Sequence, residues 1–301
     1  MRSRLEVDAA TRRIGVNRVN FAHRFTRWLL APALLATLLG AAPPPAARVQ
    51  LWRLDCGSFV IKQYGAFFSD TFQYPAGPKN IVGSCYLVRN GDRFLLWDTG
   101  LTDELIGRGL DSAAQTLSLR RSIVDQLREI GVRPEQIELI GISHWHFDHT
   151  GQARRFPGAK LLIGKGDLDH LRNRGPGVND AAAGAMAHWL TGGGQVDALT
   201  GDKDVFGDGR VVMLDTPGHT PGHNALLVRL VSGPVLLTGD IYHFTEQVAN
   251  RGVPPFNHDR ADSLASMDRF DRIEKNLGAK VIIQHEPADI AKLPAFPRAA
   301  E

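Results

Sequence analysis

Cysteine is scarce in this sequence of 301 residues, which contains only Cys56 and Cys85. Two cysteines exclude a disulfide-rich scaffold, and their spacing matches no cysteine-based metal site. In an oxidising compartment the two residues could form one disulfide. Because each lies in or beside a strand-like segment, two small buried hydrophobic side chains would fit the same positions. The sequence leaves both alternatives open.

The sequence also lacks an apolar run long enough to span a bilayer comfortably. Residues 28–39 are mostly apolar but number only twelve and include Pro32. An arginine-rich stretch precedes them and small residues and prolines follow, an order typical of an export signal. An uncleaved membrane anchor is the alternative. We expect residues 1–47 to be an export signal and linker, and residues 48–301 to be one domain released into a periplasm or outside the cell.

Positive charge is sparse outside this leader. The chain carries a formal net charge of +3, but residues 1–48 hold eight arginines against Glu6 and Asp8, a net of +6. The remainder therefore carries +3 less +6, or −3. A mildly acidic domain does not suit a phosphate backbone, so we expect no nucleic-acid partner.

From residue 48 onward, short apolar runs alternate with turn signals and helical stretches. Residues 115–130 and 262–277 have helical periodicity, and residues 64–79 and 173–202 are aperiodic and suit loops over a site. Asn90-Gly91 is a hairpin signal. Strands are expected over residues 49–54, 84–88, 94–97, 137–142, 160–163, 210–214, 225–230, 234–237 and 280–283. Mixed sheets with helices outside, a layered α/β or α+β fold, follow from this order.

Three histidines and an aspartate lie within six residues, in the segment His144-Trp-His-Phe-Asp-His149 directly after a strand. On an extended chain, His144 and His146 face the same way and can bind one ion. Asp148 and His149 can project together from the following turn, and a carboxylate beside an imidazole suits a second divalent ion. We therefore expect a metal site here rather than a chance polar cluster.

Other polar side chains follow apolar strands in the same manner. His219 lies at the tip of a tight loop that two glycines and two prolines shape, in the segment from Asp215 to His223. Asp240 ends one apolar run and His285 ends another. Each alone is weak, but their shared position behind a strand points to further metal ligands.

These motifs together resemble the metallo-β-lactamase superfamily. The similarity comprises HxHxDH, a GHTPGH loop, Thr238-Gly-Asp240, a late strand ending in histidine, and Trp97-Asp-Thr-Gly100, and it covers roughly residues 50–286. It implies an αββα sandwich of two mixed sheets flanked by helices, with the metals at one edge. In this superfamily the aspartate of the Trp97-Asp-Thr-Gly100 motif supports the ligand histidines.

The resemblance also implies the metal ligands. A first ion would be held by His144, His146 and His219, a second by Asp148, His149 and His285, and Asp240 would bridge the two. The ions are expected to be Zn2+, and metal-bound hydroxide would be the nucleophile because a bound metal lowers the pKa of water to about 7. His170, His188, His243 and His258 match no ligand position, and His223 is expected to support the His219 loop.

Within the superfamily, the sequence is most similar to the exported branch of the N-acyl-homoserine lactonases. Asp55-Cys-Gly57, Ser84-Cys-Tyr-Leu87 and Leu96-Trp-Asp-Thr-Gly100 carry this similarity. The family places a tyrosine three residues after the bridging aspartate, where this sequence has His243. Tyr242 stands one residue earlier, and we expect Tyr242 and Asp148 to be catalytic. A tyrosine that only packs on the loop is the alternative.

The implied activity is hydrolysis of the lactone ring of N-acyl homoserine lactones, small molecules whose acyl chain could contact the aromatic stretch 64–74; that stretch could equally be core. Hydrolysis of another lactone, ester or thioester is the first alternative, ahead of a phosphotriesterase or β-lactamase. A scaffold protein without metal is the non-enzymatic alternative. The sequence leaves open whether the chain forms a homodimer.

Overall fold

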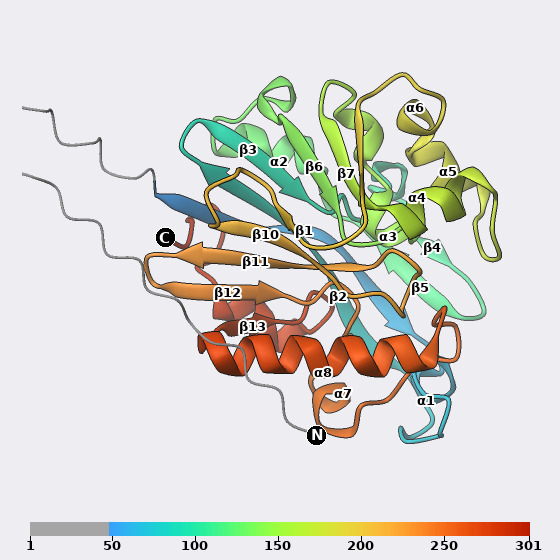
Figure 1. The fold of residues 1–301 in the computed structure, drawn as a ribbon. Coiled ribbons are helices and arrows are strands. Elements are labelled where there is room, and N and C mark those ends of the chain that lie inside the picture. Colours follow the sequence, from blue (N-terminus) through green and yellow to red (C-terminus); the bar gives the residue numbers. More distant parts are fainter. Residues whose placement is uncertain (1–47) are drawn as a thin grey trace, which may run out of the picture. The chain divides into compact units, whose positions relative to one another are not determined.

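The computed structural model describes residues 48–301, and the expected export signal lies outside them. Two sheets form the centre of the domain (Figure 1). The larger sheet has the order β4-β5-β1-β2-β3-β6-β7-β8, and the smaller has the order β13-β12-β11-β10-β9. Strands of the larger sheet are β1 (Val49–Ile61), β2 (Lys79–Asn90), β3 (Arg93–Trp97), β4 (Leu110–Asp111), β5 (Gln115–Ser118), β6 (Leu139–Ile142), β7 (Lys160–Gly164) and β8 (Val196–Leu199). Those of the smaller sheet are β9 (Lys203–Asp204), β10 (Val211–Asp215), β11 (Asn224–Leu230), β12 (Gly233–Leu237) and β13 (Lys280–Ile282).

Helices cover the outer faces of both sheets (Figure 1). The α-helices are α1 (Tyr64–Phe67), α2 (Ile123–Glu129), α3 (Phe147–Thr150), α4 (Lys165–Arg172), α5 (Asp180–Ala185), α6 (Ala187–Leu190), α7 (Thr245–Asn250) and α8 (Arg260–Leu277). Short 3-10 helices are η1 (Asp103–Leu105), η2 (Pro134–Gln136), η3 (Ala153–Arg155) and η4 (Pro287–Lys292). No helix among residues 48–301 is long and apolar enough to cross a membrane.

Three apolar layers hold the sandwich together. Between the sheets, side chains such as Leu95 and Trp97 pack against Met213 and Leu226. The outer face of the larger sheet packs on α2 and α4, and that of the smaller sheet packs on α8 through residues such as Phe270. This arrangement confirms the predicted αββα architecture.

The longest helix, α8, has clear start and stop signals. The Asp259 side chain accepts a hydrogen bond from the Asp262 backbone N–H at 2.8 Å, which caps the first turn. Gly278 ends the helix in the left-handed conformation with φ 58°. The helix predicted over residues 262–277 is therefore confirmed.

The helix predicted over residues 115–130 is wrong in its first half. Residues 115–118 form β5, which pairs with β1 and places Leu117 opposite Phe59. Helix α2 begins only after Ser122, whose hydroxyl accepts from the Asp125 backbone N–H. Burial of Leu117 in the apolar cluster that contains Phe59 and Phe68 outweighs the helical periodicity. The two expected loops are also partly structured, because α1 lies in 64–79 and α5, α6 and β8 lie in 173–202.

The two cysteines form a disulfide that joins β1 to β2. The S–S distance is 2.06 Å and the Cα atoms are 5.7 Å apart. Both side chains are fully buried, so the packing alternative described their surroundings correctly but not their bonding.

Candidate metal centre

Seven predicted ligands meet at one edge of the sandwich because each follows the carboxyl end of a strand or the turn after it. His144 and His146 follow β6, and α3 then presents Asp148 and His149. The remaining ligands follow β10, β12 and β13, and they are His219, Asp240 and His285. Strands β3, β6 and β7 are parallel neighbours, as are β12 and β13, so these ends lie together.

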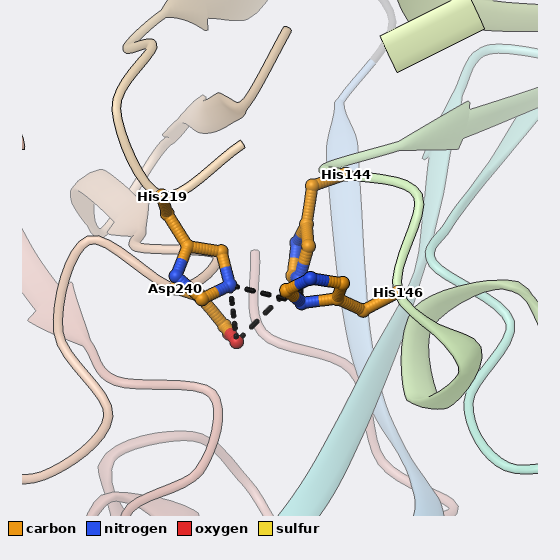
Figure 2. Close-up of side chains that lie close together, drawn as sticks. All are labelled: His144, His146, His219 and Asp240. Carbon is orange, nitrogen blue, oxygen red and sulfur yellow. Dashed lines mark hydrogen bonds and ion pairs between the residues drawn. The ribbon is translucent and has the colours of Figure 1, made fainter. Parts of the chain in front are cut away.

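The first group of side chains surrounds a position that suits a metal ion (Figure 2). His146 Nδ1 lies 2.9 Å from His144 Nε2 and 3.0 Å from His219 Nε2. Asp240 Oδ2 lies 3.4 Å from His219 Nε2 and 3.5 Å from His144 Nε2. A tetrahedral zinc ion with bonds of about 2.0–2.1 Å holds its ligands about 3.3–3.4 Å apart, close to these separations.

The second group contains Asp148, His149 and His285. The two histidine Nε2 atoms are 3.3 Å apart, and Asp148 Oδ2 lies 3.9 Å from that of His149 and 3.8 Å from that of His285. Asp240 Oδ1 lies 3.1 Å from His285 Nε2 and 3.4 Å from His149 Nε2. One carboxylate thus directs one oxygen at each group.

Asp240 also provides the test of whether a metal fits. Its Oδ1 atom is buried and has no hydrogen-bond partner in the described part of the chain. A buried carboxylate oxygen without a partner is costly, and a cation removes that cost. The donor set of imidazole and carboxylate is the one that zinc and similar divalent ions prefer.

The protonation of the histidines differs between the two groups. Burial lowers the pKa of His146 to about 4, and it lowers the pKa of His144 and His219 well below the usual value. These rings are therefore neutral at pH 7 and offer lone pairs to an ion. Burial also acts to lower the pKa of His149 and His285, but Asp240 and the other carboxylates outweigh it and raise both pKa values.

Hydrogen bonds to the far nitrogen of the ligand rings set their orientation, which fixes the tautomer that can bind a metal. The Nδ1 atoms of His144, His149, His219 and His285 lie next to Ser143 Oγ, Asp98 Oδ2, Asn257 Oδ1 and Val82 O, at 3.0, 2.9, 2.9 and 2.7 Å respectively. These four rings therefore direct Nε2 to the centre, whereas His146 directs Nδ1.

Asp98 supports the ligand histidines, as the Trp97-Asp-Thr-Gly100 motif predicts. Besides its contact with His149, it accepts the Ser143 backbone N–H at 2.7 Å. Gln284, which the sequence analysis missed, donates to Asp98 Oδ2 at 2.9 Å and accepts from Trp97 Nε1 at 2.9 Å. Its position just before His285 was the only signal in the sequence.

His223 supports the loop around His219, as expected, and it supports a second segment as well. Its Nε2 accepts the backbone N–H of Asp240 at 2.8 Å, and its Nδ1 lies 2.9 Å from Thr216 Oγ1. The ring therefore fixes the turn that carries the bridging carboxylate, in addition to closing the loop around His219. Neither metal-ligating group includes His170, His188, His243 or His258.

The structure corrects the prediction for Tyr242. Its ring packs under α8 in the apolar layer that contains Phe270, and its hydroxyl donates to Asp271 Oδ1 at 2.9 Å. His243 instead faces the centre, with Nε2 3.2 Å from Asp240 Oδ2. The reason is that these adjacent residues after β12 point to opposite sides. Tyr242 points toward α8, and His243 points toward the candidate metal centre.

The orientation of the His243 ring follows from its neighbours. Gln247 Nε2 donates to the Gly252 carbonyl at 2.7 Å, so Gln247 Oε1 is the atom that faces His243. That oxygen lies 3.2 Å from His243 Nδ1, which donates a hydrogen bond to it. The ring is thereby oriented with Nε2 toward Asp240 Oδ2, at the offset where the lactonase family has a tyrosine.

A pocket of about 360 Å³ opens beside the metal centre. Its apolar wall includes Phe59, Phe67, Phe68 and Phe256. Pro176, Gly177, Asn179 and Ala182 also line the pocket. The aromatic stretch 64–74 contributes both to the pocket and to the core. Phe67 and Phe68 line the pocket, whereas Tyr74 packs into the core beside Phe244. Of the eighteen residues that line this pocket, none is lysine or arginine.

Comparison with known proteins gives concordant results. Residues 79–285 match the metallo-beta-lactamase superfamily. The chain is 27% identical over 226 residues to N-acyl homoserine lactonase AttM of Rhizobium johnstonii, covering 67% of this chain and 81% of that protein. It is 30% identical over 192 residues to AttM of Rhizobium radiobacter, covering 58% and 68%. The fold resembles an N-acyl homoserine lactone hydrolase solved with N-hexanoyl-L-homoserine at its catalytic metal centre (TM-score 0.71, 21% identity, 85% and 100% covered).

Proposed function

Since the chain belongs to the metallo-β-lactamase superfamily and is a hydrolase, we propose that it opens the lactone ring of N-acyl homoserine lactones at a centre of two divalent ions. His144, His146 and His219 would hold one ion, Asp148, His149 and His285 the other, and Asp240 both. Zinc suits this donor set. When bound, two such ions make a nucleophile from water at neutral pH and polarise a carbonyl oxygen.

The observation that carries the proposal is the position of Asp240 between both ligand groups and next to an apolar pocket. Its two oxygens face different histidines, and Oδ1 has no other partner among residues 48–301. The centre and the pocket share His146, Asp148, Asp240 and His285. A carbonyl bound at the centre would therefore leave its attached apolar group against the phenylalanine wall.

The side chains of this protein would divide the remaining work between them. The phenylalanine wall binds an acyl chain and excludes water from it, as apolar pockets do. His243 is held by Gln247 through Nδ1 and contacts Asp240 through Nε2, so it would orient the bridging carboxylate. Asp98 and Asn257 keep their ligand histidines in the metal-binding orientation. The lack of lysine or arginine along the pocket disfavours an anionic substrate such as a glutathione thioester.

A hydrolysis panel tests the proposal. The zinc-loaded protein would be compared on N-hexanoyl homoserine lactone, an aliphatic γ-lactone, an acyl thioester, a β-lactam and a phosphotriester. We expect the highest kcat/KM on the homoserine lactone, loss of that activity with a chelator, and recovery with zinc. A higher kcat/KM on the thioester or phosphotriester would contradict the proposed substrate while leaving the metal centre standing.

A further inference from the structure

Asp167 is a fully buried carboxylate in the first turn of α4, and it touches two other segments of the chain. Its Oδ2 accepts from the Trp145 backbone N–H at 2.8 Å and from Thr220 Oγ1 at 2.9 Å. Its Oδ1 accepts from the Gly222 backbone N–H at 2.6 Å. No ion pair to Asp167 occurs within the described chain, so these three donors compensate its burial.

The donors lie next to particular ligands. Trp145 stands between His144 and His146, and Thr220 directly follows His219. The single carboxylate therefore ties together the two segments that carry all three histidines of the first ion. Within residues 48–301, no hydrogen bond or ion pair joins it to Asp148, His149 or His285, the side chains of the second group.

The local backbone shows that α4 is built to deliver this carboxylate. A Cβ on Gly164 would overlap the Gly222 carbonyl, and a Cβ on Gly166 would overlap that of Pro221. Only glycine at both positions lets the start of α4 approach the loop around His219 so closely. Asp167 does not cap its own helix, because the N-cap position is Gly164 and no side chain caps it.

The energetics agree with a positioning role. Burial raises the pKa of Asp167 to about 7, while the bonds from Thr220, Gly222 and Trp145 act in the opposite direction. A buried carboxylate of this kind is unfavourable unless its donors are held in place. The three bonds consequently restrain both ligand segments as well as the aspartate.

We propose that Asp167 is a positioning residue that sets the affinity of the first metal ion, the one held by His144, His146 and His219, more than that of the second. This inference rests on the proposed dinuclear centre. Partners that orient metal ligands typically contribute about 10–100-fold to metal affinity or activity when they are removed. Asp167 acts one step further out, through the backbone on which the ligands stand.

The test compares full-length Asp167→Asn with Asp169→Asn. Asparagine keeps the size of the side chain but has a single acceptor oxygen, so at least one of the three donors faces an amide N–H. Asp169 lies two residues further along α4, has a side chain 44% exposed, and forms an ion pair with Lys165 in the same helix. Zinc affinities come from competition with a chelator, and anomalous diffraction at the zinc edge identifies the ion that is retained.

We expect first-ion affinity to fall about 10–100-fold in Asp167→Asn, with the second ion retained and Asp169→Asn unchanged. Equal loss of both ions, or no change, would overturn the role of Asp167. Thr220→Val, which removes one donor and keeps the carboxylate, should weaken the first ion in the same direction if Asp167→Asn does not fold; no change would again overturn the role. Failure of the unmodified protein to bind zinc would instead overturn the proposed centre.

Discussion

Tyr242 and His243 are adjacent in the sequence but belong to different parts of the structure. Tyr242 lies under α8 and bonds to Asp271, whereas His243 lines the pocket beside Asp240. Resemblance to the lactonases favoured the tyrosine because that family has a tyrosine shortly after the bridging aspartate. The decisive factor is the direction of each side chain after β12, which a one-residue offset reverses.

Tyr242→Phe should therefore leave kcat/KM on a homoserine lactone within about twofold of the unmodified protein. It removes one hydrogen bond to Asp271, so the free energy of unfolding should fall by about 0.5–1.5 kcal/mol. His243→Ala should lower kcat/KM at least about tenfold, the lower end of the effect of losing a group that orients a metal site. Steady-state kinetics at equal zinc content and urea unfolding measure both effects. A large loss of activity from Tyr242→Phe alone would restore the original assignment.

The side chains of both candidate ligand groups could be found from the sequence because most of them are concentrated in one short segment. The segment from His144 to His149 holds four side chains of metal-ligating types within six residues, and packing in a protein core does not require such a cluster. Asp167, Asn257 and Gln284 could not be found in this way. Each is a single polar residue whose contact with the site is made to a residue 22 or more positions away, so only the folded chain reveals that contact.

At the level of elements, the prediction succeeded where a strand or helix has its own boundary signals. Strands β6 and β7 lie within a residue or two of the predicted limits, and the Asn90-Gly91 turn joins β2 to β3 with Gly91 at φ 65°. It failed at residues 115–118, where helical periodicity continued across a strand. That strand exists because β1 offers it a pairing edge, which depends on a segment more than fifty residues earlier.

The disulfide between β1 and β2 should contribute measurably to stability. It closes a loop with a sequence separation of 29 residues. Chain-entropy arguments give about 3–4 kcal/mol for a loop of this size. The double variant Cys56→Ala/Cys85→Ala should lower the free energy of unfolding by about that amount in guanidinium chloride. An unchanged midpoint in the double variant would show that packing alone stabilises this pair of strands.

The disulfide also lies close to the segment that supports the metal centre. Leu101 lies three residues after Asp98, and its backbone N–H donates to the Cys56 carbonyl at 3.1 Å. A side chain on Gly100 would overlap Cys56, and Gly100 has φ 62°. The link therefore fixes β1 against the turn that carries Asp98, so part of its effect should reach the orientation of His149.

At the scale of the whole molecule, the proposed function depends on bringing four separate strand ends, those of β6, β10, β12 and β13, to one edge. The ligands come from segments that span residues 144 to 285, and both sheets contribute. The layered class of fold follows from the order of strands and helices, which the sequence shows. The edge at which the ligands meet follows from strand pairing between distant segments, and resemblance rather than periodicity predicted it.

The central claim is that seven side chains hold two ions and that Asp240 joins them. The most direct test is the metal content of the zinc-loaded protein and of Asp240→Ala, measured by mass spectrometry after removal of free metal, with exposed Asp92→Ala as control. We expect about two equivalents per chain in the unmodified protein and in the control. Asp240→Ala should hold one equivalent or less and show no lactone hydrolysis, because the shared carboxylate no longer offsets repulsion between the ions. Two retained equivalents with near-normal activity in Asp240→Ala would contradict the account.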